Sequence, residues 1–190
     1  MRKIYITETQ LKNLMTEMAK PNSIVAYHGS NSEINSFVTD FVGGSEAIDH
    51  EGPGIYFTTD KEDAGSYGQY IYQVTLTPRK LLSDQNRKGI TVNDAIKLIK
   101  MAQGWEDDAM NWDENPSKGL KISLQSIFDE DNAKDIITQI YVEYYRSNPK
   151  EFVNNAAKLG FDGIIVTKDW DASHIIVYNP SIIHIEKGAF

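Results

Sequence analysis

The chain has 190 residues, of which 41% are hydrophobic, so it can bury one sizeable core but not two full domains. The formal charge of -8, from 19 basic and 27 acidic residues, excludes a general electrostatic attraction to phosphate backbones or anionic lipid. The absence of cysteine excludes disulfides, thiolate catalysis and metal sites that contain cysteine.

Residues 1–20 are expected to form an N-terminal extension, a strand followed by a helix. Residues 3–7 have a strand pattern, and Thr7 or Thr9 can cap a helix that Pro21 ends. We interpret this helix as packed on the flank of the domain; a detachable targeting or partner-binding arm is the alternative. No apolar run approaches the roughly 20 residues of a membrane-spanning helix, and the N-terminus lacks a hydrophobic signal core, so we expect a cytoplasmic protein without membrane contact.

A β-rich part is predicted to follow. Residues 24–27 form an apolar strand that runs into His28. Residues 42–54 combine glycine and proline with acidic residues, which is the composition of a mobile loop. The pattern then predicts a strand, a short helix capped by Asp60 and a second strand, over residues 55–58, 60–67 and 70–76.

The pattern becomes helical over residues 91–150, which we interpret as a helical insertion. Helices are predicted over residues 92–102, 120–128 and 133–145. The acidic segment 105–116 separates the first two, and within it Trp105, Trp112 and the acids between them are interpreted as an exposed or lid-like loop.

The C-terminal part returns to strands. A last helix over residues 150–158 precedes strands over residues 163–167, 174–178 and 182–185. Strands and helices are mixed without strict alternation, which favours an α+β fold over a doubly wound sheet. We expect residues 1–190 to form a single domain.

Three short sequences carry the candidate functional residues. In chain order they are Tyr27-His28-Gly29-Ser30, then Gly52-Pro53-Gly54-Ile55-Tyr56-Phe57-Thr58 leading to Ala64-Gly65-Ser66-Tyr67, and finally His174-Ile175-Ile176-Val177-Tyr178-Asn179-Pro180. In order and spacing they resemble the His-Tyr-Glu branch of the ADP-ribosyltransferase superfamily, which includes the diphtheria-toxin-like and poly(ADP-ribose)-polymerase-like enzymes. The small phage and polyvalent-protein versions are the most similar, because the sequence GFDGIIV of residues 160–166 also recurs there. The resemblance covers residues 24–77 and 159–186, and it implies a split β-sheet core and NAD as co-substrate.

The resemblance implies that the first motif binds the nicotinamide end of NAD. His28 would hydrogen-bond a ribose hydroxyl, the main chain of Gly29 would hold the nicotinamide amide, and Ser30 would lie beside them. An imidazole at a strand end is a directional hydrogen-bonding group, and a glycine leaves room for a planar amide to approach the backbone. The alternative is that His28 is a structural histidine.

The resemblance also implies that Tyr56 and Tyr67 sandwich the nicotinamide ring, with Phe57 and Ser66 beside them. A positively charged nicotinamide over an electron-rich ring gains a cation–π attraction of ~0.5 to 2 kcal/mol, which is lost when neutral nicotinamide departs. The alternative is that both tyrosines are ordinary core or surface aromatics, since the chain has ten tyrosines. The family's amide-binding serine would fall at Ala64, so that contact is missing here.

The third motif departs from the family, because His174 stands where the family has its catalytic glutamate. A neutral imidazole can bind the ribose hydroxyl and serve as a base, but it supplies no negative charge. Losing such a contact typically costs ~2.7 to 4 kcal/mol, which argues against full polymerase-like activity and leaves mono-transfer or slow chemistry. We therefore expect an atypical triad of His28, Tyr56 and His174, and expect His174→Glu to preserve or raise activity.

Acidic residues near this triad offer a replacement carboxylate. Asp169 and Asp171 precede the last motif, and Glu46 and Glu51 lie in the glycine-rich loop. We favour the interpretation that all four are solvated loop charges.

The preferred function is an NAD-dependent mono-ADP-ribosyltransferase, a phage or bacterial effector that modifies a host macromolecule. A host protein is the expected acceptor, and nucleic acid is not favoured. The first alternative is a module of the same fold that binds NAD, ADP-ribose or a protein without turnover, and the second is an NAD glycohydrolase.

We expect no metal ion. The four histidines share no close helical spacing and there is no cysteine. A zinc site shared by His28 and His174 is the alternative.

Overall fold

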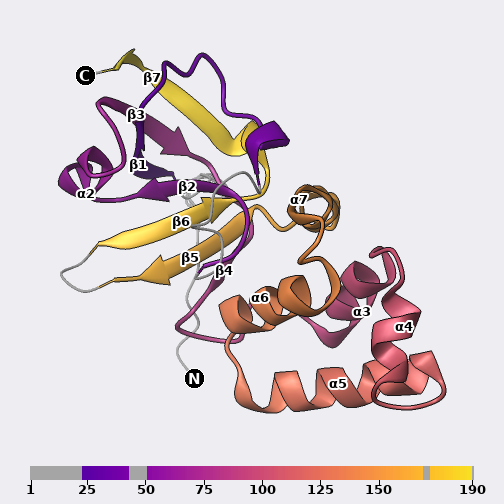
Figure 1. Cartoon of the computed structure of the whole chain (residues 1–190). Helices are drawn as coiled ribbons and strands as arrows, with labels where there is room; N and C mark the ends of the chain where they lie inside the picture. Colours follow the sequence, from indigo (N-terminus) through magenta and orange to yellow (C-terminus); the bar gives the residue numbers. More distant parts are fainter. Residues whose placement is uncertain (1–22, 43–50, 169–171, 190) are drawn as a thin grey trace, which may run out of the picture.

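The computed structural model describes residues 23–42, 51–168 and 172–189 (Figure 1). The expected N-terminal strand and helix lie outside these residues. The described strands are β1 (Ile24–Ser30), β2 (Ile55–Thr58), β3 (Tyr70–Leu76), β4 (Leu81–Ser83), β5 (Gly163–Thr167), β6 (Ser173–Val177) and β7 (Ile183–Ala189). The described α-helices are α2 (Lys61–Gly65), α3 (Val92–Lys100), α4 (Trp105–Met110), α5 (Pro116–Glu130), α6 (Ala133–Tyr144) and α7 (Pro149–Lys158), and two short 3-10 turns are η1 (Thr39–Phe41) and η3 (Pro180–Ile182).

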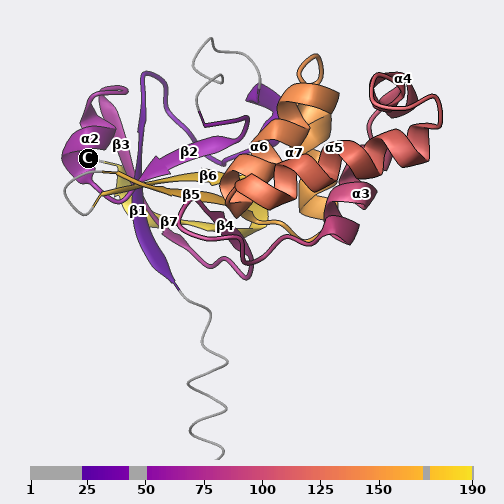
Figure 2. The same ribbon diagram turned by 90° about the horizontal axis from the view of Figure 1, so that it is seen from below.

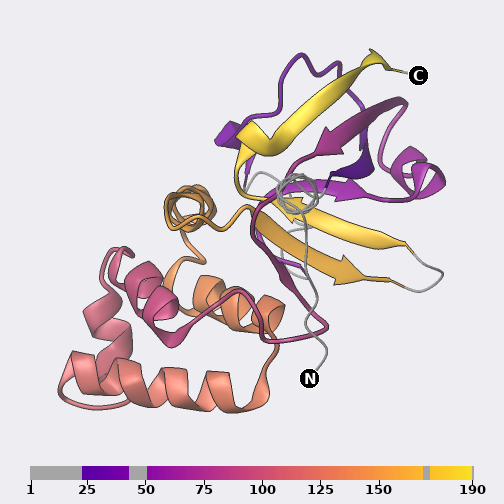
Figure 3. The ribbon, with the colours of Figure 1, turned by 180° about the vertical axis from the view of Figure 1, so that it is seen from behind.

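The seven described strands form one sheet in the order β4-β5-β6-β2-β1-β3-β7, and the sheet is nearly split in its middle. Strands β1 and β2 pair at one position of the described residues, Tyr27 with Thr58, whereas β1 and β3 pair continuously from Ile24 to Ser30. The half β4-β5-β6-β2 and the half β1-β3-β7 therefore diverge on either side of this point (Figure 3). The predicted α+β fold with a split sheet is confirmed.

Strand β3 alternates between buried and partly exposed residues, as the sequence predicts. Residues Tyr72, Val74 and Leu76 of β3 are buried while their neighbours along the strand are partly exposed. They pack with Ala26 of β1 and Val177 of β6 in a core that crosses the split. This shared core is what holds the two half-sheets together where backbone pairing stops.

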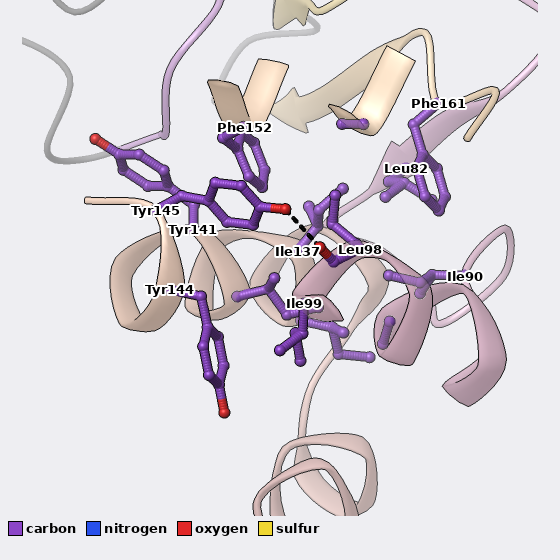
Figure 4. Packing of buried hydrophobic residues seen from close by; sticks show 14 of the residues in the cluster. Leu82, Ile90, Leu98, Ile99, Ile137, Tyr141, Tyr144, Tyr145, Phe152 and Phe161 are labelled. Carbon is purple, nitrogen blue, oxygen red and sulfur yellow. Dashed lines mark hydrogen bonds between the residues drawn. The ribbon is translucent and has the colours of Figure 1, made fainter. Parts of the chain in front are cut away.

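The helical segment lies beside the half-sheet of β4 and β5, away from α2 (Figure 2). Helices α3, α5, α6 and α7 begin at side-chain caps, Thr91 in a capping box with Asp94 and the asparagines at positions 115, 132 and 148. Tyr145 donates its buried hydroxyl to the main-chain oxygen of Leu98 at 2.5 Å, which ties the end of α6 to α3 (Figure 4).

The helices share one core with the sheet. Phe152 of α7 packs edge-on against Tyr178, at the end of β6, with ring centroids 5.5 Å apart. Leu82 of β4 and Ile164 of β5 belong to the same buried cluster as the helices. The segment interpreted from sequence as an insertion is therefore continuous with the domain core.

The sequence prediction is wrong for the start of the acidic segment 105–116, which forms helix α4 and not a loop. Glu106, Asp107 and Asp108 occupy its first turn, where negative charge stabilises the positive end of the helix dipole. Ala109 is fully buried, and Trp105 is partly buried with the Lys100 ammonium 5.3 Å from its ring centroid. The acidic residues therefore mark the start of a helix.

Asp162 joins three segments that are far apart in the sequence. One of its carboxylate oxygens accepts the main-chain hydrogens of Arg79 and Lys80 at 2.7 and 3.0 Å, and the other accepts a hydrogen from Asn179 at 3.0 Å. The side chain is buried, at 5% exposure. The acid of the GFDGIIV sequence thus has a structural role, because it fixes the entry to β4 and the exit from β6.

In the described part of the chain, none of the helices has the length and apolar character needed to cross a lipid bilayer.

Candidate active site

A pocket of about 350 Å³ opens at the split between the half-sheets. The described residues that line it are Tyr27, His28, Gly29, Glu51, Tyr56, Phe57, Thr58, Ala64, Tyr67 and His174. All three sequence motifs contribute to this list. Strands β1, β2 and β6, helix α2 and the segment before β2 therefore converge on one cavity.

His28 is held firmly at the edge of the split. Its Nδ1 donates to the main-chain oxygen of Tyr56 at 2.7 Å, and its ring packs edge-on against Phe37 with centroids 5.1 Å apart. Burial lowers the pKa of His28 more than the hydrogen bond to Tyr56 raises it. The neutral ring donates from Nδ1, so its Nε2 carries a lone pair that can accept a hydrogen bond from a ligand hydroxyl.

The two tyrosines differ in exposure. Tyr56 is partly buried and donates its hydroxyl to the main-chain oxygen of Gly52 at 2.5 Å, which fixes the ring. Tyr67, just beyond α2, is 58% exposed although it lines the pocket. A large aromatic ring left exposed at a pocket is a surface available for stacking on a ligand.

Gly29 is required by the packing of α2 on β1. A Cβ at this position would stand 1.9 Å from the main-chain oxygen of Ala64, too close for any side chain. The glycine thus lets the helix that precedes Tyr67 approach the strand that carries His28. The fold itself therefore requires glycine at this position, whether or not a ligand is bound.

His174 lies between two carboxylates. It faces Thr58 across the β6–β2 ladder, and its Nδ1 lies 3.0 Å from Oε2 of Glu51 while its Nε2 lies 3.1 Å from Oδ2 of Asp63. The second oxygen of Glu51 pairs with the ammonium of Lys168, just after β5. Each contact is a hydrogen bond when the ring nitrogen concerned carries a hydrogen.

Glu51 is the most buried charge of this group. The exposure of its side chain is 11%, against 31% for the side chain of Asp63. Burial raises the pKa of Glu51, but hydrogen bonds and charge attraction from Lys168 and His174 outweigh burial and hold that pKa below its usual value. The pocket therefore contains a fixed, ionised carboxylate.

This combination of a split sheet and a three-motif pocket agrees with the comparison with known families. The sequence model of a family described as "ADP-Ribosyltransferase in polyvalent proteins" matches residues 20–185. The chain belongs to this family of ADP-ribosyltransferases. A solved structure titled "Crystal structure of an anti-CRISPR protein" is similar over 88% of this chain and 98% of that chain, at 13% sequence identity and a TM-score of 0.44, a likeness too low to carry an argument. No curated protein matches the chain.

The structure of this ADP-ribosyltransferase brings together most of the residues that the motifs suggested. His28, Gly29, Tyr56, Phe57, Tyr67 and His174 all line the pocket. Ser30 and Ser66 are not among the lining residues: the hydroxyl of Ser30 accepts from the main chain of Ser32, and that of Ser66 donates to the main-chain oxygen of Asp63.

The interpretation of Glu51 as a solvated loop charge is wrong, because its side chain is buried in the ADP-ribosyltransferase pocket. Asp169, Asp171 and Glu46 lie outside the described residues. Asp63 was not foreseen, although it precedes Tyr67 by four positions, a spacing that places two side chains on one side of a helical turn. Lys168 gave no sequence signal, since its role depends on a contact between distant segments.

The two histidines of the pocket have different hydrogen-bond partners. Nδ1 of His28 is bound to the Tyr56 carbonyl, and both nitrogens of His174 face carboxylates. His184, on β7, contacts the hydroxyl of Thr77, and His50 lies outside the described residues. Within the described ranges no group of three or more histidine, aspartate or glutamate side chains forms a potential metal site.

Proposed function

We propose that this ADP-ribosyltransferase uses NAD as its co-substrate and transfers a single ADP-ribose to a macromolecule of a host cell. The observation that supports it most is the convergence of His28, Tyr56, Tyr67 and His174, from three separate motifs, on one pocket at the split of the sheet. We propose one domain over residues 1–190, since the family match spans both the sheet and the helices.

Each side chain has a role that follows from its environment. The free lone pair on Nε2 of His28 accepts a hydrogen bond from a ribose hydroxyl. The rings of Tyr56 and Tyr67 stack on the charged nicotinamide, and the main chain of Gly29 binds its amide. His174 lines the same pocket as these residues.

The reaction breaks the bond between C1′ of the ribose and the ring nitrogen of nicotinamide. The electron pair of that bond stays on the nitrogen, so neutral nicotinamide leaves and C1′ becomes an oxocarbenium-like centre. A nucleophilic atom of the acceptor then forms the new bond to C1′ and loses its proton to solvent or to a base. The cation–π attraction of the tyrosines weakens once nicotinamide is neutral, which favours its release.

The acceptor in this proposal is a host protein, and the enzyme is a phage or bacterial effector that acts in the host cytoplasm. The net charge of -8 disfavours a polyanionic acceptor such as nucleic acid.

Incubation of the protein with labelled NAD and a host lysate tests the proposal. We expect label on a protein band, and we expect His28→Ala and Tyr67→Ala to reduce it at an NAD concentration below the wild-type Kd. The matched control is His184→Ala, because His184 lies on β7 and contacts Thr77 outside the pocket. Absence of any NAD binding, cleavage or labelling by the wild type would contradict the proposal.

The third motif carries His174 where the family motif has glutamate. This observation favours two alternatives. A non-catalytic module would bind NAD or ADP-ribose without labelling a macromolecule. A glycohydrolase would release nicotinamide and free ADP-ribose with no labelled acceptor.

A further inference from the structure

Glu51 is a carboxylate in an environment that is unusual for a purely structural acid. An ionised carboxylate is costly to bury unless partners compensate it. Here Lys168 pairs with one oxygen and His174 with the other, so the charge is retained and its direction is fixed. The same side chain also lines the open pocket.

Glu51 lines the same pocket as Tyr56 and Tyr67. Burial, and after it the charge of Glu51, raises the pKa of the Tyr56 hydroxyl. Burial, then Asp63 and then Glu51 raise the pKa of Tyr67. The carboxylate and both rings therefore border one cavity, in which the charge of Glu51 acts on both tyrosines.

No neighbouring described group combines a negative charge with a place in the pocket lining. His174, between two carboxylates, is neutral or positive. Asp63 is negative, but its side chain is 31% exposed on α2, so water weakens its electric field in the pocket. Of the described residues that line the pocket, Glu51 is the one with a carboxylate.

We infer that Glu51 is a catalytic residue that supplies, from the segment before β2, the fixed negative charge missing from the third motif. This inference rests on the proposed function. As the bond between C1′ and nicotinamide breaks, positive charge moves from the pyridinium ring to the ribose. A preorganised anion beside the ribose stabilises that transition state more than it stabilises the bound NAD. His174 and Lys168 are positioning residues that hold the carboxylate.

The geometry also changes the expectation for His174→Glu. The introduced carboxylate would stand between Glu51 and Asp63, where His174 now lies 3.0 and 3.1 Å from their oxygens. Three carboxylates at such distances repel one another, so the single substitution lowers activity. In the double variant Glu51→Gln/His174→Glu, residue 51 is neutral and residue 174 carries the carboxylate. The contact between these two positions therefore keeps one negative charge.

The test measures NAD binding by calorimetry and nicotinamide release in single turnovers, for the wild type and a set of variants. We expect Glu51→Gln to slow release by about 10² to 10³-fold while the Kd for NAD changes by less than about threefold. The matched control is Glu186→Gln, since Glu186 lies on β7 and accepts a hydrogen bond from Thr75 away from the pocket. It should release nicotinamide at the wild-type rate.

Two further variants separate a direct role of Glu51 from a role through His174. We expect His174→Gln to lose less activity than Glu51→Gln, and the double variant Glu51→Gln/His174→Glu to regain at least about tenfold over Glu51→Gln. Equal losses in Glu51→Gln, His174→Gln and their double variant would overturn the inference, because Glu51 would then act through His174 alone. If Glu51→Gln does not fold by circular dichroism, Glu51→Asp replaces it: a wild-type rate would overturn the inference, and a loss of tenfold or more would support it.

Failure of the inference and failure of the proposed function give different results. If the wild type releases nicotinamide and Glu51→Gln does so equally fast, the inference alone is overturned. If the wild type neither binds nor cleaves NAD, the proposed function fails and the inference fails with it.

Discussion

The ring of His28 donates its Nδ1 hydrogen to the main-chain oxygen of Tyr56 at 2.7 Å, across the point where the two half-sheets separate. The ladder between β1 and β2 has a single paired position, Tyr27 with Thr58. The hydrogen bond of the His28 side chain therefore connects the two strands where backbone pairing has stopped. The same bond fixes which ring nitrogen is left to accept a hydrogen bond in the pocket. The orientation of the His28 ring is therefore set by a hydrogen bond at the split of the sheet.

This bond predicts the effect of removing the imidazole. His28→Ala removes the acceptor for the ribose hydroxyl and leaves the Tyr56 oxygen without its partner, so we expect NAD affinity to fall by about 10- to 100-fold, which corresponds to ~1 to 3 kcal/mol. Calorimetric titration with NAD measures the change. An affinity equal to that of the His184→Ala control would show that His28 does not contact the ligand.

The lowered pKa of His28 predicts a pH dependence of folding stability. The unfolded chain protonates this histidine near its ordinary value of 6.5, whereas the folded chain protonates it at a lower pH. The contribution of neutral His28 to stability is therefore complete above pH 6.5 and is lost as the pH falls from 6.5 through the lowered folded pKa. Urea unfolding between pH 7.5 and 5 measures the effect, and His28→Gln should flatten this part of the curve. A curve that the substitution leaves unchanged would contradict the prediction.

The exposure of Tyr67 predicts that its ring contributes to binding and little to folding. Tyr67→Ala should weaken NAD binding by about 3- to 30-fold, from the loss of ~0.5 to 2 kcal/mol of cation–π stacking, while the thermal midpoint stays close to the wild type. Tyr67→Phe is the control, because it keeps the ring face and removes the hydroxyl. A loss in Tyr67→Phe as large as in Tyr67→Ala would show that the hydroxyl, not the ring face, makes the contact.

The close approach of α2 to β1 predicts that alanine substitution at two glycines changes the free energy of unfolding in opposite directions. Gly29→Ala forces a Cβ to 1.9 Å from the Ala64 oxygen and should destabilise the fold by about 3 kcal/mol. Gly65→Ala places a Cβ in ordinary contact, 3.6 Å from Ile71, and should stabilise by about 0.5 to 1 kcal/mol because alanine is the better helix residue. Urea unfolding of both variants compares them directly. Equal stabilities would mean that α2 does not pack on β1 as described.

Most strands of the sheet were predictable because their signal is local, whereas the three-residue strand β4 was not predicted. The alternation in residues 70–76 is visible in the sequence, and so is the apolar run before His28. The charge network was not predictable, since Glu51, Asp63, Lys168 and His174 come from four segments that meet through the folded chain. Helix α4 was missed because acidic residues suggest a solvated loop unless their effect on a helix start is considered.

The buried position of Asp162 predicts a large loss of stability on its removal. Asp162→Ala leaves the main-chain hydrogens of Arg79 and Lys80 without acceptors in a partly buried place, and each such loss costs ~1 to 3 kcal/mol, so we expect the free energy of unfolding to fall by about 2 to 5 kcal/mol. Because Asp162 is not among the residues that line the pocket, the folded fraction of the variant should still bind NAD with nearly the wild-type Kd. Asp40→Ala is the control for removing a charge, since Asp40 forms an exposed ion pair with Lys150, and it should leave the urea midpoint unchanged. An Asp162→Ala variant as stable as this control would show that the carboxylate does not hold the β4 entry and the β6 exit together.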